Sequence, residues 1–245
     1  MKDVSESEAA IIAAAAVTAH LESAPKPHAT AAAASHRAAT AAGSGKRGGP
    51  VKLLHVARGE FKEGVCGAKS TNIAKLHKIA ATAGGLFAVP PSVTLPFGTC
   101  ETLLALPANA AVAKAVKGHV QAAVKALEAA AAGTSGDAAK AAAATAIAGA
   151  AELEAARAEL TDGLVTDKAT EAALVEALAT VGEKAEALPA LWRGVKLVWA
   201  SKWTDRAVLS RRAQGITDEQ LSIAVLVQVG ATCTCLCTYE CIICV

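Results

Sequence analysis

One lysine of this sequence stands where a phosphate could bind. Lys69 lies in the run GVCGAKS at residues 64–70, which precedes apolar residues at helical spacing. The free amides and the dipole at a helix N-terminus favour an anion, so Lys69 is a candidate for phosphate contact. The alternative is a solvated lysine beside a structural turn. The run is not a Walker A loop, because Ala68 and Glu63 occupy the two glycine positions of that motif.

A second candidate lies near the tryptophans. Trp192, Trp199 and Trp203 recur at spacings that put them on one face of a single helix, and Arg206 follows Trp199 by seven residues. Arg206 could approach a phosphate, or it could stack on a tryptophan in a purely structural role. We expect the tryptophans to be core rather than a carbohydrate platform, because they share one helix face. Lys202 is expected to be a solvated charge.

Thiolate chemistry is the third possibility. Five of the seven cysteines crowd the end of the chain, between Cys233 and Cys244. Such a cluster could bind a soft metal ion such as zinc or copper(I), although Cys-x-Cys spacing lacks the partner pair of a standard zinc site. An odd, end-loaded cysteine count argues against a disulfide framework and for a reducing compartment.

Helices and short strands must position these residues. Hydrophobic periodicity and Gly/Pro punctuation predict an extended segment with prolines at a sheet edge or strand end (89–96) and a short helix from 97–99 toward 106. Thr217 to Gln220 resembles a capping box, and Pro189 suits a helix start. The remaining predictions are strands at 51–56 and 221–229, helices at 71–83 and 190–212, and neither helix nor ordinary strand at 230–245.

Alanine dominates the middle of the chain. Residues 108–188 are predicted to form an Ala-rich helical region with helices at 111–132, 136–160 and 170–188. A methyl side chain buries little apolar area, so the core must rely on Leu, Val, Ile and the three tryptophans. Residues 1–50 are of low complexity and are expected to be a disordered linker.

The charge balance limits the classes of partner. The chain of 245 residues carries 24 basic and 22 acidic residues, a net charge of +2, which provides no global field for nucleic acid or an anionic membrane. No apolar run approaches the ~20 residues of a membrane-spanning helix, and no usable secretory signal opens the chain. We therefore expect a soluble, intracellular protein with neither nucleic acid nor membrane as partner.

Three segments occur in order along the chain: 65–76 (VCGAKSTNIAKL), 89–98 (VPPSVTLPFG), and 198–207 (VWASKWTDRA) followed by 224–228 (AVLVQ). Together they resemble the nucleotide-binding domain of the alpha-glucan water dikinases, a family related to pyruvate phosphate dikinase and phosphoenolpyruvate synthase. Ala68 and the Ser-Lys-Trp run at 201–203 are more similar to the glucan branch than to the pyruvate branch.

The resemblance implies an α/β, helix-rich chain in which residues 51–229 form part of an ATP-grasp-like domain that binds ATP with Mg²⁺, the 108–188 region being an insertion. It implies ATP binding by Lys69, Arg206 and Gln228. In complete enzymes of this family the β-phosphate passes through a histidine on another domain to a glucose unit of starch, and the γ-phosphate goes to water. The family also implies a chloroplast location.

The pattern breaks after Gln228. Val229 stands where the family has an acidic residue, the later Mg²⁺ and γ-phosphate ligands have no counterpart, and none of the six histidines matches the phosphorylated one. We interpret residues 230–245 as an aberrant Cys-rich tail from read-through into non-coding or shifted sequence. The chain is thus predicted to hold no catalytic residue and no metal ligand, to bind ATP weakly or not at all, and to be inactive alone. The alternative functions are a non-catalytic Ala-rich helical interaction protein and a thiolate metal binder.

Overall fold

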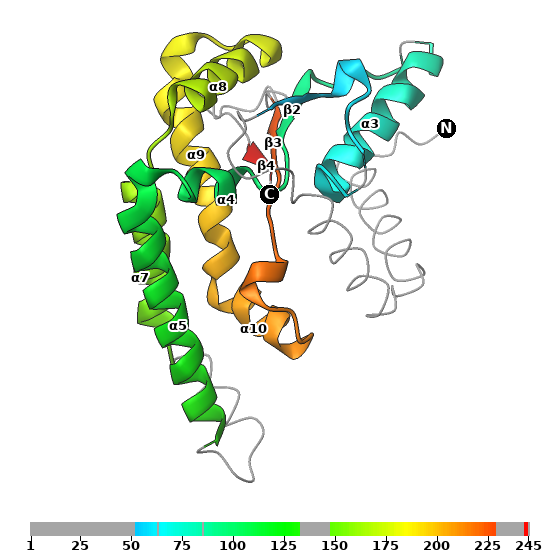
Figure 1. Ribbon diagram of the computed structural model, residues 1–245. Helices are drawn as coiled ribbons and strands as arrows, with labels where there is room; N and C mark the ends of the chain where they lie inside the picture. Colours follow the sequence, from blue (N-terminus) through cyan, green and yellow to red (C-terminus); the bar gives the residue numbers. More distant parts are fainter. Residues whose placement is uncertain (1–51, 63, 85, 133–147, 229–242, 245) are drawn as a thin grey trace, which may run out of the picture. The chain divides into compact units, whose positions relative to one another are not determined.

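The computed structural model describes residues 52–62, 64–84, 86–132, 148–228 and 243–244, all within the unit Ser35–Val245 (Figure 1). The predicted linker at 1–50 and the tail cysteines from Cys233 to Cys241 lie outside the described residues. The helices are α3 (Gly67–Thr82), α4 (Thr99–Leu104), α5 (Ala110–Ala132), α7 (Ala150–Gly163), α8 (Lys168–Val181), α9 (Leu188–Ala200) and α10 (Asp205–Ala213). The strands are β1 (Leu54–His55), β2 (Ser92–Leu95), β3 (Val225–Gln228) and β4 (Ile243–Cys244), and the 3-10 turns are η1 (Val56–Arg58), η2 (Pro107–Asn109), η3 (Ala185–Ala187), η4 (Ser201–Trp203) and η5 (Asp218–Gln220).

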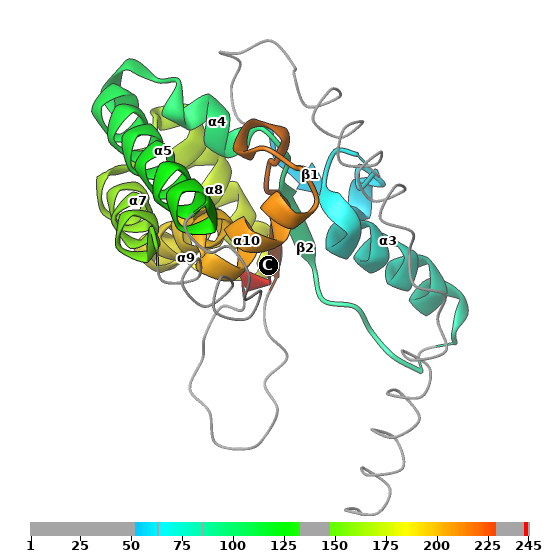
Figure 2. The same ribbon diagram turned by 90° about the horizontal axis from the view of Figure 1, so that it is seen from below.

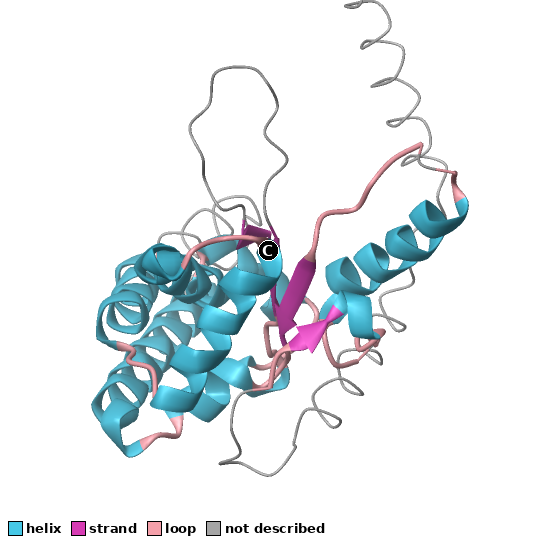
Figure 3. Ribbon diagram, turned by 90° about the horizontal axis from the view of Figure 1, so that it is seen from above, coloured by secondary structure: helices cyan, strands magenta, loops and turns pink. Residues whose placement is uncertain are grey.

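The strands, magenta in Figure 3, form one small sheet. Its strand order is β1-β2-β3-β4, and all neighbouring strands are antiparallel. Of the two alternatives predicted for the 89–96 segment, the sheet edge is wrong, and the prolines instead stand at the strand ends. Pro91 and Pro96 stand immediately outside β2, so every residue of the strand keeps its amide and the strand pairs on both sides. The expectation that 230–245 contains no strand is wrong for Ile243 and Cys244, which pair with β3.

The two faces of the sheet carry different layers. Successive side chains of a strand alternate between faces. Val93 and Val227, both fully buried, point into the main core with α8 and α9. Thr94 and Leu226 point to the opposite face, where Leu226 joins a second apolar cluster beside the start of α3. Figures 1 and 2 show α3 on one side of β2 and the remaining helices on the other.

Alanine contributes to the core by allowing close approach of helices. α5 and α7 run antiparallel, with Gly149 against Ala123 at one end and Gly163 against Val112 at the other. Ala123 and Ala156 are fully buried between these helices. Small side chains therefore shorten the distance between backbones, while the larger buried residues on α7, α8 and α9 supply the apolar area, as the composition predicted.

The tryptophans belong to the core, as predicted. Trp199 is 1% exposed and Trp203 is 5% exposed, and both lie in the main cluster. Trp192 packs against it with its ring edge-to-face to that of Trp199, at 5.9 Å between centroids. An edge-to-face pair of this kind stabilises the fold beyond the contribution of the apolar area that the two rings bury.

The predicted single helix at 190–212 is interrupted. It begins at Leu188 with Pro189 in its first turn, as expected, but α9 ends at Ala200 and η4 follows. Thr204 is extended, and its side-chain oxygen accepts from the Ala207 amide, so Thr204 caps a new helix, α10. The seven-residue relation between Trp199 and Arg206 thus does not place them on one helix face.

Other predicted bounds shift for local reasons. The helix predicted at 170–188 begins after Asp167, whose carboxylate accepts from the Thr170 amide at 2.7 Å, and ends at Gly182. The helix predicted at 136–160 falls partly outside the described residues, and its described part is α7. The predictions for 111–132 and for the short helix toward 106 are confirmed by α5 and α4.

The strands predicted at 51–56 and 221–229 are shorter than expected. After His55 the chain turns into η1, and the His55 amide donates to the Glu60 carboxylate at 2.8 Å instead of to a neighbouring strand. Before β3, the Leu221 carbonyl accepts from the Lys202 ammonium and the Ser222 hydroxyl accepts from the Gly98 amide. These tertiary bonds hold the residues before Val225 in an irregular conformation.

Gly149 offers a test of the helical packing. Its φ is +88°, and a Cβ there would lie 2.9 Å from the Ala123 carbonyl oxygen. We expect Gly149→Ala to lower the free energy of unfolding by about 2 kcal/mol or more, because it adds backbone strain to a backbone clash. Gly118, exposed on α5 with nothing within 4 Å, is the matched control: Gly118→Ala should stabilise by about 1 kcal/mol through helix propensity. Urea unfolding monitored by circular dichroism checks both variants. Equal changes in the free energy of unfolding would contradict the close contact of Gly149 with the Ala123 backbone.

Candidate functional site

The turn that carries Lys69 is fastened to the end of β2. The Phe97 amide donates to the Val65 carbonyl at 3.0 Å, and the Phe97 ring covers Gly67. Gly67 has φ +77°, a conformation that side chains rarely adopt, and a Cβ there would lie 3.4 Å from the ring. The turn is therefore defined by a glycine requirement and by contact with the segment that resembles the family's VPPSVTLPFG run.

The helix begins earlier than the sequence predicts. α3 starts at Gly67 rather than at Thr71, so Lys69 is the third residue of its first turn. Cys66 precedes the helix, and its thiol donates to the Lys62 carbonyl at 3.2 Å. Burial raises the pKa of the Cys66 thiol, which keeps it uncharged beside the helix start. No acidic residue lies in the first turn, so the positive potential of the helix end is not neutralised there.

Lys69 is exposed, and its side chain makes no ion pair or hydrogen bond with other described residues. The next residue, Ser70, is 2% exposed and faces the sheet. Its hydroxyl lies 2.8 Å from that of Thr94 on β2, which is fully buried. The lysine thus projects to solvent from a turn whose neighbouring residue is bonded to the central strand.

Gln228 lies on the same face of the sheet as this bond. It pairs with Ser92, two residues before Thr94, so Ser92, Thr94 and Gln228 alternate onto the α3 side. Two residues correspond to about 7 Å along a strand. The structure therefore places Gln228 on the face of the sheet to which Ser70 of α3 is bonded, although 158 positions separate these two residues in the sequence.

Arg206 occupies a different place. It is the second residue of α10, it is exposed, and its side chain makes no hydrogen bond or ion pair with other described residues. α10 packs against η4 and faces α5 across a cleft, so Arg206 belongs to the helical side of the chain. Its proposed contact with ATP remains a prediction.

A polar network that the sequence did not predict lies beside α10. Arg211, whose side chain is 9% exposed, donates to the Asp218 carboxylate at 2.5 Å and to the Lys202 carbonyl at 2.6 Å. The second Asp218 oxygen accepts from the Trp203 indole at 2.6 Å. Lys202 is not a solvated charge, because its ammonium donates to the Leu221 carbonyl at 2.8 Å and lies over the Trp203 ring. The Ser-Lys-Trp run is thus structural in this fold.

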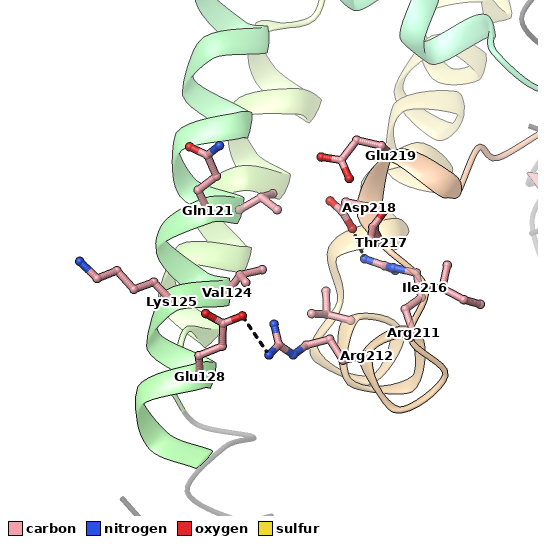
Figure 4. Close-up of a pocket in the computed structure, with 13 residues that line it drawn as sticks. Gln121, Val124, Lys125, Glu128, Arg211, Arg212, Ile216, Thr217, Asp218 and Glu219 are labelled. Carbon is pink, nitrogen blue, oxygen red and sulfur yellow. Dashed lines mark hydrogen bonds and ion pairs between the residues drawn. The ribbon is translucent and has the colours of Figure 1, made fainter. Parts of the chain in front are cut away.

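The network borders a cleft of about 520 Å³ between α5 and the segment from α10 to η5 (Figure 4). Its charged residues include Lys125 and Glu128 on α5 and Arg212 opposite them. Arg212 and Glu128 form an ion pair across the cleft at 3.4 Å. Glu219 projects toward α5 (Figure 4). Since the lining charges of both signs balance, this cleft has no preference for an anion such as ATP.

The only sequence signal for the network was the Thr217 to Gln220 capping box. The Thr217 amide does donate to the Gln220 side chain at 2.9 Å, and this turn presents Asp218 to Arg211. Among the residues the structure describes, no group of three or more His, Cys, Asp or Glu side chains could hold a metal ion. Within the same residues, no helix is long and apolar enough to cross a membrane.

Comparison with known proteins yields two relatives of one kind. The chain is 31% identical over 180 residues to a chloroplastic alpha-glucan water dikinase of Solanum tuberosum, and 32% identical over 181 residues to one of Citrus reticulata. Each match covers 69% of this chain but only 10% of the relative, so the chain spans about a tenth of the length of the curated relatives it matches. No protein-family model and no solved structure matches.

These matches support a distant relationship between this chain and the alpha-glucan water dikinases, which the sequence resemblance predicted. A dikinase relationship implies ATP and Mg²⁺ use in the family. The helix-rich part of the predicted fold class is confirmed, and the described sheet is small and antiparallel. The ATP-grasp-like architecture remains a prediction, because no solved structure tests it.

The Arg211–Asp218 pair provides a testable energetic prediction. We expect Asp218→Ala to lower the free energy of unfolding by about 3 kcal/mol, because it leaves the buried Arg211 charge without its carboxylate and the Trp203 indole without its acceptor. Glu219→Ala removes an exposed neighbouring charge and should change stability by less than about 0.5 kcal/mol. Chemical denaturation of both variants checks this, and equal small losses would show that the network contributes little.

Proposed function

We propose that residues 51–229 are the phosphate-binding portion of the ATP-binding domain of a glucan-phosphorylating dikinase. Lys69 and the free amides at the start of α3 contact the phosphates of ATP. Gln228, at the end of β3, lies beside the adenine base of ATP. Arg206 is on the helical side of the sheet, so it contacts a phosphate only when that side lies close to the ATP bound at α3. The match to two alpha-glucan water dikinases over 69% of the chain carries the proposal.

The local geometry supports the assignment to phosphate binding. An exposed cation in the first turn of a 16-residue helix adds its charge to the positive end of the helix dipole. No carboxylate in that turn competes for it. The Phe97 ring packs on one side of Gly67, and this contact together with the positive φ of Gly67 fixes the backbone of the turn whose free amides follow.

The wider setting follows from the relatives. We propose Mg²⁺ as the ion that accompanies ATP, starch or another alpha-glucan as the acceptor in a complete dikinase, and the chloroplast as the compartment, since both relatives are named chloroplastic. Phosphoryl transfer depends on metal-assisted charge neutralisation and positioning. We therefore propose that this chain by itself binds nucleotide weakly and does not transfer phosphate.

Titration of the isotope-labelled full chain with Mg-ATP tests the proposal. We expect saturable NMR shift changes at the amides of Gly67 to Ser70, with a dissociation constant near or above about 1 mM, which corresponds to only about 4 kcal/mol of binding free energy. Lys69→Met should abolish these changes, because it removes the only side-chain cation of the first turn.

Lys78→Met is the matched control, since Lys78 is an exposed lysine farther along the same helix. It should leave the titration unchanged. Loss of the response in both variants, or in neither, would refute phosphate contact by Lys69. A magnesium-dependent micromolar dissociation constant would refute the prediction that the chain binds weakly.

A further inference from the structure

The attachment of α3 to the sheet is unusual. In a helix of 16 residues, Ser70 is the only one that is fully buried. The apolar residues of the second half face outward, with Leu76 43% exposed and Ile79 53% exposed. Only Ile73 and Ala74, which are partly buried, pack against the apolar cluster beside the sheet. An apolar stripe therefore does not determine how the first turn of α3 sits on the sheet.

The strand beneath the helix is the most constrained part of the fold. Thr94 pairs with Leu54 of β1 on one side and with Leu226 of β3 on the other, so its position is fixed from both directions. Its hydroxyl is buried and its partner is the hydroxyl of Ser70, at 2.8 Å. A buried hydroxyl without a partner carries a desolvation cost, so the pair favours one placement of the turn.

We propose that the Ser70–Thr94 hydrogen bond is a positioning device for the phosphate site, and that Ser70 and Thr94 are positioning residues that act through Lys69 and the amides beside it. This inference rests on the proposed function. Lys69 directly precedes Ser70, and about 100° of helix rotation per residue turns the lysine away from the sheet while the serine faces it. Fixing the serine to β2 thereby fixes the direction in which the lysine and the free amides point.

Two single variants and the double variant that combines them separate positioning from stability. Ser70→Ala and Thr94→Val each leave one hydroxyl unpaired, and both should destabilise the chain. The double variant Ser70→Ala/Thr94→Val removes both hydroxyls, which restores the match between buried groups and should return the unfolding midpoint to near its wild-type value. Two controls retain the bond between residues 70 and 94: Thr94→Ser keeps the hydroxyl on β2, and Thr82→Ala removes only an exposed hydroxyl at the far end of α3, which donates to the Ile79 carbonyl.

Amide hydrogen exchange of the full chain is the first readout. The amides of Thr71, Asn72 and Ile73 bond to the carbonyls of the first turn. In the double variant we expect them to exchange at least about fivefold faster, the equivalent of one typical hydrogen bond, while the unfolding midpoint is unchanged. Both controls should exchange as the wild type does. Unchanged exchange in the double variant would overturn the inference.

Titration with Mg-ATP is the second readout. The double variant should bind Mg-ATP at least about fivefold more weakly than the wild type, whereas Thr94→Ser, which keeps the hydroxyl, should bind Mg-ATP as the wild type does. Faster exchange with undiminished ATP binding would also overturn the inference, because the bond would then be structural only. If the wild type gives no ATP response at all, the proposed function fails, and the exchange measurement alone decides whether the bond holds the turn.

Discussion

The pairing of β2 with β3 is the constraint on which the rest of the described structure depends. It joins residues 92–95 to residues 225–228, and the chain between them contains α4 through α10. Val93 and Val227 pack into the main core on one face of the sheet. Thr94 and Leu226 lie on the opposite face, which α3 covers. One four-residue strand therefore anchors both layers, and it does so because its prolines lie outside the paired residues rather than within them.

The two layers hold their helices by different physical means. On the helical side, buried leucines, valines and tryptophans on α5 to α9 supply apolar area, and small alanines let α5 and α7 approach closely. On the other side, α3 is held by a hydroxyl pair, by the Phe97 contact with its first glycine and by a small apolar cluster. The phosphate-binding candidate lies where packing is sparse, so polar contacts determine its geometry.

Several features could be predicted from the sequence, and the failures have identifiable causes. The start of α9 at Pro189, the buried tryptophans and the strand at Val225 followed from periodicity and from turn residues. The interruption at Thr204 was missed because the tryptophan spacing suggested one continuous helix, although Thr followed by Asp is a common helix start. The Arg211–Asp218–Trp203 network was missed because its members become neighbours only when η4 and η5 pack together.

By itself, the sequence determined the distant relationship to the dikinases, the helix-rich character and the candidacy of Lys69, because motif residues and hydrophobic spacing are local properties of the chain. Only the tertiary structure decided that Gln228 shares a sheet face with the start of α3, that Arg206 lies on the helical side, and that Ser70 meets Thr94. The reason is physical: strand register and helix docking depend on contacts between residues that are distant in the sequence, 24 positions apart for Ser70 and Thr94 and more than a hundred for β2 and β3, and no local pattern encodes such contacts.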